Sequence, residues 1–106
     1  MVRPDHWEMT TTTLVGMAVI LCNQGRHVKA MEKYQQVLPI YEKEYESDSV
    51  KRAELLHHIA VTLKNEGKSK EAMEKYKRCL AIQEKVLGIN HATTIMTSDS
   101  IEELQR

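Results

Sequence analysis

The sequence repeats itself at a spacing of 42 residues. When residues 10–51 are compared with residues 52–93, 15 of the 42 pairs are identical, and five of these pairs form the run Ala-Met-Glu-Lys-Tyr at 30–34 and 72–76. A period of about 20 to 50 residues is typical of solenoids, in which each unit buries its apolar face only against neighbouring units. The chain is therefore predicted to be an array of similar units that presents surfaces to other molecules.

Each unit carries the pattern of two amphipathic helices. In the first unit Leu14, Ala18 and Leu21 lie at the i, i+4, i+7 spacing of one helix face, and the second unit repeats this pattern. Gly25 and Gly67 follow the first helix of each unit, where glycine commonly ends a helix in a left-handed conformation. We expect an all-α fold of antiparallel helix-turn-helix units, an α-solenoid with about five helices, at residues 10–24, 27–46, 50–66, 69–87 and 92–104.

These helices divide the chain into four parts, which are an irregular N-terminal segment at 1–9, a first unit at 10–51, a second unit at 52–90 and a C-terminal capping helix at 91–106. The capping helix matches the repeat poorly, because Ser98 and Glu102 stand where apolar residues recur in the other units. A terminal cap requires a polar outer face of this kind. Pro39 lies inside the second helix, where we expect a kink and not a stop.

Charge and hydrophobicity exclude several classes of protein. Fifteen Lys and Arg side chains balance fifteen Asp and Glu side chains, so the chain lacks the net attraction that binders of nucleic acid and anionic membranes use. The longest apolar run, at residues 14–22, is too short to cross a bilayer, and the N-terminus lacks the apolar core of a secretory signal. We expect a cytoplasmic protein that binds neither nucleic acid nor membrane.

No residue pattern in the chain points to catalysis, a cofactor or a metal. The sequence contains no nucleophile elbow, phosphate-binding loop or pair of carboxylates in an apolar frame. His57 and His58 are adjacent, so on a helix they point about 100° apart, and no third ligand completes a site. Cys22 and Cys79 lack Cys-x-x-Cys spacing and are expected to be small core residues in a reducing compartment. We therefore expect no enzyme activity and no cofactor.

The spacing of the small and aromatic residues resembles that of the tetratricopeptide repeat. Ala18, Ala30 and Tyr34 recur 42 residues later as alanine, alanine and tyrosine, and a glycine separates the two helices of each unit. The long period and the residues at 81–91 look more narrowly like the repeats of kinesin light chains and their relatives. The resemblance implies a scaffold or adaptor whose first helices line a concave groove that binds an extended peptide.

Spacing places a stripe of residues from each unit on the groove that the resemblance implies. The stripe begins at Thr12 in the first unit and at Glu54 in the second. Light-chain repeats carry an asparagine pair where this sequence has Val15-Gly16 and His57-His58, and the carboxylate clamp of chaperone-binding relatives is missing. The residues expected to bind the partner are Val15, Val19, Cys22, Asn23, His57, Val61, Lys64 and Asn65.

The first helix is apolar on all sides between residues 14 and 22, the pattern of a helix that is buried all round. The sequence has no preceding unit to cover its Val15, Val19 and Cys22 stripe. Trp7 and Met9 folding back, a second copy of the chain or a ligand segment should therefore cover it. Two functions stay open: a protein–protein interaction module that binds a partner peptide or helix in the groove, and a structural element that self-assembles as a homodimer through the first helix.

Overall fold

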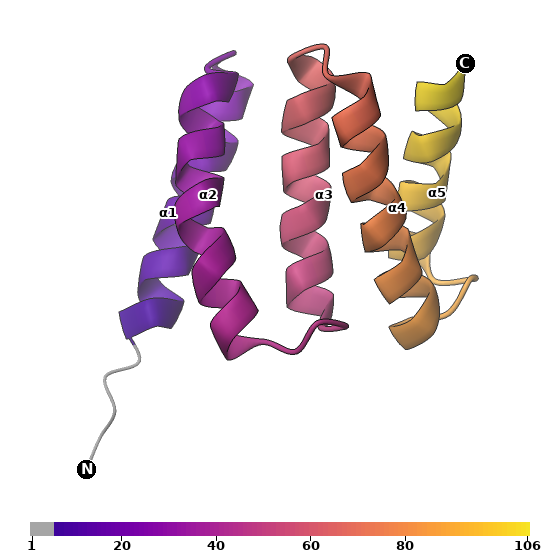
Figure 1. Ribbon diagram of the computed structural model, residues 1–106, viewed down its shortest axis with the longest axis horizontal. Coiled ribbons are helices and arrows are strands. Elements are labelled where there is room, and N and C mark those ends of the chain that lie inside the picture. Colours follow the sequence, from indigo (N-terminus) through magenta and orange to yellow (C-terminus); the bar gives the residue numbers. More distant parts are fainter. Residues whose placement is uncertain (1–5) are drawn as a thin grey trace.

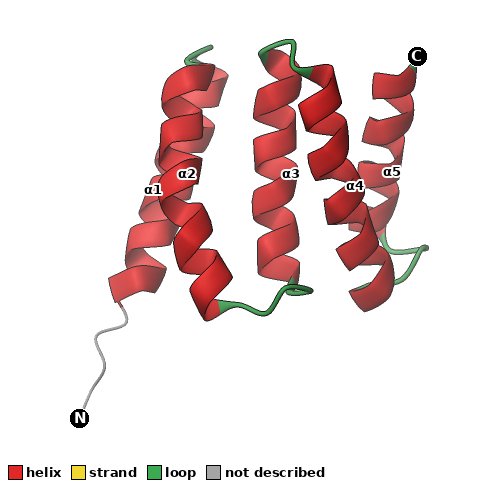
Figure 2. Cartoon of the chain, viewed as in Figure 1, coloured by secondary structure: helices red, strands yellow, loops and turns green. Residues whose placement is uncertain are grey.

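The computed structural model describes residues 6–106, which fold into helices joined by short loops (Figure 1, Figure 2). The helices are α1 (His6–Asn23), α2 (His27–Glu44), α3 (Val50–Asn65), α4 (Ser69–Val86) and α5 (Ala92–Gln105). Within the described residues there is no strand. The prediction of an all-α helical array is confirmed.

The helices stand side by side along the longest axis of the molecule, which measures 52 Å against 32 and 19 Å for the other two axes. In Figure 1, α1 lies behind α2 and α5 lies behind α4, so α1 and α5 are found at opposite ends of the array. One cluster of buried apolar residues extends from Ala18 of α1 to Ile101 of α5, and it joins the two units into one body. None of the described helices is long and apolar enough to cross a membrane.

Glycine ends the first helix of each unit. Gly25 and Gly67 have φ angles of +80° and +83°, which residues with a Cβ atom rarely adopt. The Arg26 amide donates to the Leu21 carbonyl at 2.8 Å, and the Gly25 amide donates to the Cys22 carbonyl at 3.0 Å. This pair of bonds satisfies carbonyls that the helix end would otherwise leave free. Each hairpin turn is therefore determined locally by one glycine.

Small residues let neighbouring helices approach closely. The alanines that the repeat preserves, at positions 18, 30, 60 and 72, have no exposed surface. Tyr34 and Tyr76 belong to the same core and are 1% and 0% exposed. Interlocking of small and large side chains gives the close packing that helix pairs require. The 42-residue repeat in the sequence is thus a repeat of packing contacts.

The predicted helix boundaries hold everywhere except at the start of the chain. α2 to α5 begin at the predicted residues and end within two residues of the prediction. α1 begins at His6 and not at Thr10. The expectation of an irregular segment over 1–9 is therefore wrong for residues 6–9, and residues 1–5 lie outside the described part of the chain.

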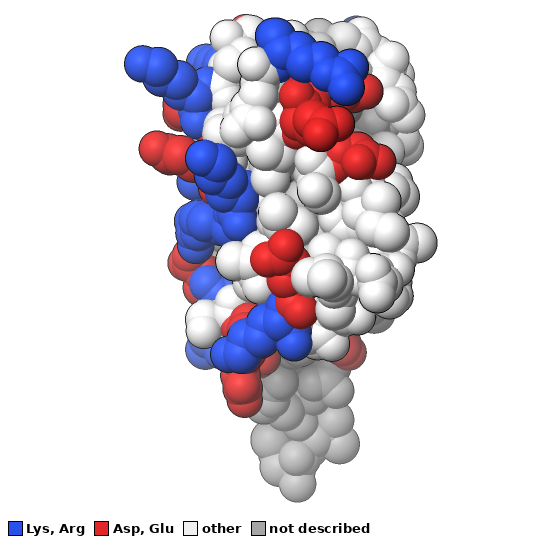
Figure 3. Space-filling view, turned by 90° about the vertical axis from the view of Figure 1, so that its right-hand side faces the viewer, with Lys and Arg blue, Asp and Glu red and all other residues white. Residues whose placement is uncertain are grey.

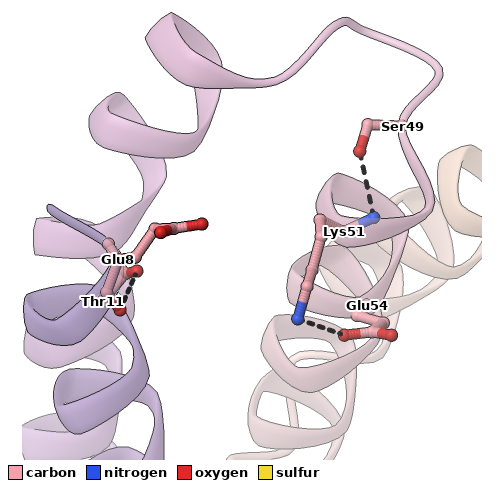
Figure 4. Close-up of polar contacts among 5 residues, drawn as sticks. All are labelled: Glu8, Thr11, Ser49, Lys51 and Glu54. Carbon is pink, nitrogen blue, oxygen red and sulfur yellow. Dashed lines mark hydrogen bonds and ion pairs between the residues drawn. The ribbon is translucent and has the colours of Figure 1, made fainter. Parts of the chain in front are cut away.

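Packing and local hydrogen bonding explain the early start of α1. Thr11 Oγ1 donates a hydrogen bond to the Glu8 carbonyl at 3.2 Å (Figure 4), so the hydroxyl is satisfied within the helix. The Trp7 ring meets the Tyr45 ring edge-on at a centroid distance of 5.5 Å. The low helix propensity of the threonines is thus outweighed by a contact that anchors the first turn.

α2 continues through Pro39 and ends at Glu44. Proline removes one amide donor and crowds the preceding turn, which is the basis of the predicted kink. In Figure 1 the lower part of α2 leans away from the axis of its upper part. The prediction that the helix continues past the proline is confirmed.

Candidate functional site

A small hollow lies between α1 and α3. Its volume is about 110 Å³, and it is lined by Thr12 and Val15 of α1, Tyr41 of α2, and Lys51, Glu54, Leu55 and His58 of α3. Tyr41 and Leu55 are buried, whereas Thr12 and the two charged residues are exposed. An apolar floor inside a polar rim is an arrangement that can hold one apolar side chain of a partner.

The first turn of α3 supplies the charged part of the rim (Figure 4). Ser49 Oγ caps this helix by accepting a hydrogen bond from the Lys51 amide at 3.1 Å. Lys51 Nζ lies 3.8 Å from Glu54 Oε1, and both side chains are 54% exposed. Exposed ion pairs stabilise a fold only weakly. Both groups therefore remain able to bind polar groups of another molecule.

The two histidines of α3 make different contacts. The His58 ring stacks on Tyr34 with centroids 5.9 Å apart, and the His57 ring meets Tyr76 edge-on at 5.5 Å. Burial lowers the pKa of both His57 and His58, because a charged imidazole loses its hydration there. Burial also raises the pKa of Tyr34 to about 12 and raises the pKa of Tyr76. All four rings are therefore uncharged near neutral pH.

Of the four predicted partner-binding residues on α1, Val15 lines the hollow. Val19 and Cys22 follow it one and two turns along the helix, and both are half-buried. Cys22 Sγ lies 3.0 Å from Thr62 Oγ1, so this side chain is engaged between α1 and α3. Asn23 is exposed at the last residue of α1. The structure thus spreads these residues along α1 beyond the hollow.

The four predicted residues on α3 lie outside the hollow. His57 and Val61 are half-buried, and Val61 packs against the core cluster. Lys64 and Asn65 are exposed in the last turn of α3. The eight predicted residues do not form a single pocket, and their joint role in binding stays a prediction.

Four residues of the hollow are absent from the groove stripes that spacing predicts, namely Tyr41, Lys51, Leu55 and His58. Tyr41 comes from the second helix of the unit, whereas the predicted stripes contain only residues of the first helices. Lys51, Leu55 and His58 enter because α3 lies beside α1, a relationship between units that spacing within one helix does not contain. Thr12 and Glu54, which begin the two predicted stripes, both line the hollow.

In the described part of the chain, no cluster of three His, Cys, Asp or Glu side chains could hold a metal ion.

The apolar stripe of α1 is half-buried. Val15 and Cys22 pack against the core cluster, and Val19 is half-buried. The rest of the chain thus covers part of this stripe, and the expectation that a second copy or a ligand segment covers the remainder stays a prediction. Met9 itself is 73% exposed and does not fold back over the stripe.

Comparison with known proteins shows similarity to one family and to solved structures. A family model described as tetratricopeptide repeat matches residues 9–85. A crystal structure from Podosopora anserina, described as a candidate kinesin light chain with nearly identical tetratricopeptide-like repeats, has a TM-score of 0.77 and 23% sequence identity. That match covers 98% of the present chain and 47% of the other chain, so the present chain spans about half of its length. No curated protein matches the sequence.

Proposed function

This chain belongs to the tetratricopeptide repeat family, and we propose that it is a non-catalytic protein–protein interaction module that binds a partner peptide or helix along α1 and α3. Repeats of this family generally mediate protein–protein interactions. The array is of the kinesin-light-chain-like kind in its fold. The partner is a protein segment that places one apolar side chain in the hollow between these two helices.

The size and lining of the hollow support a peptide side chain as its occupant. Its volume of about 110 Å³ lies below the range of about 300 to 1,000 Å³ that is typical of small-molecule sites. Val15 and Leu55 offer apolar contact, and Lys51 and Glu54 stand at the rim with opposite charges. This combination suits an apolar anchor that is flanked by polar groups.

The remaining predicted residues would extend the contact from the hollow toward the hairpin turns. Val19 and Cys22 add apolar surface on α1, and Asn23 is exposed at its end. The contributions from α3 would come from His57, Val61, Lys64 and Asn65. Two units make a short binding path, so we expect a dissociation constant of about micromolar size for a single peptide.

The test is selection of peptides from a random library on the purified chain, followed by affinity measurements on the selected peptides. Val15→Glu combined with Val19→Glu places charge at the hollow and should weaken binding at least about tenfold. Val86→Glu is the matched control, because it makes the same change on α4 at a side chain that is already 48% exposed. Circular dichroism establishes that each variant is folded.

A second pair of variants covers the case in which charge at Val15 unfolds the chain. Thr12→Arg and Glu54→Lys change exposed rim residues, and both should alter the affinity of the selected peptides while the fold is kept. The proposal is wrong if no peptide is selected, or if the selected peptides bind the folded hollow variants as tightly as the original chain.

The alternative function, self-assembly as a homodimer through the first helix, is favoured by one observation. Met9, Met17 and Ile20 of α1 are 73%, 41% and 58% exposed on a face that α3 does not cover. Two such faces could pair without repulsion, since Thr13 and Gly16 between them are uncharged. Ile20→Glu should then convert a dimer of fixed mass into a monomer in sedimentation experiments.

We also propose a cytoplasmic location. The two cysteines, Cys22 and Cys79, are free thiols. Free thiols persist in reducing compartments and are commonly oxidised in secreted proteins. Fusion of the chain to a fluorescent protein and imaging in cells would test the location directly.

A further inference from the structure

A second groove lies between α1 and α2, at the end of the array opposite α5. Its volume is about 420 Å³, and it shares no residue with the hollow between α1 and α3. Met17, Ile20 and Leu21 of α1 supply its apolar lining. All charged side chains in the lining come from α2 and the turn before it. The groove is therefore a distinct surface with an apolar floor and a charged edge.

The second unit of the repeat shows which kind of element packs against the equivalent surface. Met17 and Leu21 correspond to Ile59 and Leu63 of the second unit, 42 residues later. There α2 lies beside the equivalent surface and presents apolar side chains that include Leu38, and the space left between the helices is about 220 Å³. A helix with apolar side chains is thus the occupant of the equivalent place within this same molecule.

The charge of the open groove differs from that of the equivalent surface in the second unit. Its edge carries Arg26, Lys29 and Lys33 against a single carboxylate, that of Glu32, for a net charge of +2. In the second unit the equivalent positions hold two lysines and two glutamates, because Glu71 stands in place of Lys29. The open groove therefore favours a helix that combines apolar with acidic side chains.

The outward face of α5 has this combination. Ile95 and Met96 are 45% and 61% exposed, and the exposed Asp99, Glu102 and Glu103 follow them along the helix. Arg106 offsets part of this negative charge, because its guanidinium lies 3.5 Å from the Glu102 carboxylate. Figure 3 looks onto this end of the array, where acidic groups lie near the top beside a broad uncharged surface. Basic and acidic groups alternate along the left edge of this view, and a basic group lies at its top.

We propose that the outward face of α5 docks into the groove between α1 and α2 of a second copy of this chain. Ile95 and Met96 cover the exposed side chains of Met17 and Ile20, and the acidic residues of α5 meet the cations of α2. The two surfaces are different, so each contact leaves one groove and one α5 free. Copies therefore join head to tail, and the assembly grows with concentration. This inference does not depend on peptide binding between α1 and α3.

Sedimentation velocity over a range of about 10 to 500 µM tests the contact, because weak self-association appears within this range. The average mass should rise continuously with concentration and should fall as salt is added. Lys29→Glu should abolish the rise. Lys43→Glu is the matched control, because it makes the same charge change at an exposed site of α2 that does not line the groove. It should associate like the original chain.

A charge exchange makes the test specific to the proposed pair of surfaces. Lys29→Glu with Lys33→Glu gives an acidic groove, and Asp99→Lys with Glu103→Lys gives a basic α5. Each double variant alone should stay monomeric, since its groove and its α5 then carry charge of the same sign. A mixture of the two should associate again, because each groove finds an α5 of opposite charge.

Three outcomes would overturn this inference. The first is an original chain that stays monomeric over the whole concentration range. The second is a mass that stops at twice that of one chain, which indicates a symmetric dimer. The third is a mixture of the two double variants that does not associate although both are folded.

Discussion

The sulfur of Cys22 lies 3.0 Å from the hydroxyl oxygen of Thr62, and this contact links α1 of the first unit to α3 of the second. Thr62 Oγ1 also lies 3.0 Å from the His58 carbonyl, to which it donates its one proton. The thiol of Cys22 is therefore the donor in the contact with Thr62. A pair of small polar groups thus joins the two units inside a largely apolar interface.

We predict that Cys22 and Thr62 are energetically coupled. Thr62→Val keeps the shape of the side chain but removes the acceptor, and each loss of a buried hydrogen bond costs about 1 kcal/mol of unfolding free energy. In a double-mutant cycle with Cys22→Ala, urea unfolding should give a coupling of about 1 kcal/mol. The pair Cys79 and Thr97, whose atoms are 3.9 Å apart, should give a smaller value. If the losses of unfolding free energy from the two single substitutions are strictly additive, the hydrogen bond between Cys22 and Thr62 is contradicted.

The two thiols should differ in reactivity. Cys79 is fully buried, and burial raises the pKa of its thiol to about 11, so little thiolate is present at pH 8. We expect an aromatic disulfide reagent to modify the half-buried Cys22 first and Cys79 only when the chain unfolds. In Cys22→Ala the fast phase should be lost, and the remaining rate should rise with urea. A fast phase that persists in this variant would show that Cys79 is accessible in the native state.

Stability should fall as the pH is lowered from neutral toward 5. The pKa values of His57 and His58 in the folded chain lie below the ordinary value of 6.5, so the unfolded chain binds more protons below that pH. The contribution of the two neutral rings is therefore complete above about pH 6.5 and is lost as the pH falls toward the folded pKa values. The midpoint of urea unfolding at a series of pH values measures this loss.

Two sets of histidine substitutions serve as controls for the pH prediction. The variant with His57→Gln and His58→Gln should show a flatter decline of the urea midpoint with falling pH, even if it is less stable overall. His91→Ser measures the effect of replacing a histidine outside this pair, because serine can still accept the hydrogen bond that His91 Nδ1 accepts from the Thr93 amide at 3.1 Å. An unchanged slope in the double variant would assign the decline to other groups.

Gly16 should be replaceable by alanine with a gain in stability. A Cβ atom at this position would meet nothing within 4 Å, and alanine is favoured over glycine inside a helix by about 1 kcal/mol. Gly67→Ala should have the opposite effect, since its φ of +83° costs about 1 to 2 kcal/mol for a residue with a side chain. Thermal unfolding at low concentration compares the two. A loss of stability in Gly16→Ala would mean that another molecule packs closely against this glycine.

Much of the fold could be predicted because its determinants are local. Gly25 and Gly67 end helices through their own backbone conformation, and the buried alanines recur at fixed spacing, so helix ends and packing faces follow from short stretches of sequence. The start of α1 could not be predicted in this way. Its first turn depends on the contact of Trp7 with Tyr45, residues that lie 38 positions apart in the chain.

The candidate site was predicted less well than the fold for a related reason. Spacing along a helix tells which side chains share a face, and three residues of the stripes that it predicts, Thr12, Val15 and Glu54, line one hollow. It could not tell that His58 and Tyr41 complete the hollow, because these residues reach it only through the packing of one helix against another.

By itself, the sequence determined the number of helices, the turns between them and the repeated small and large residues at their contacts, since helix periodicity and glycine conformation act over a few residues. Only the tertiary structure decided which faces stay open. The packing of α1 against the core half-buries Val15 and Cys22 and leaves Met17 and Ile20 more exposed. That outcome depends on how whole helices pack in space, and no local pattern contains it.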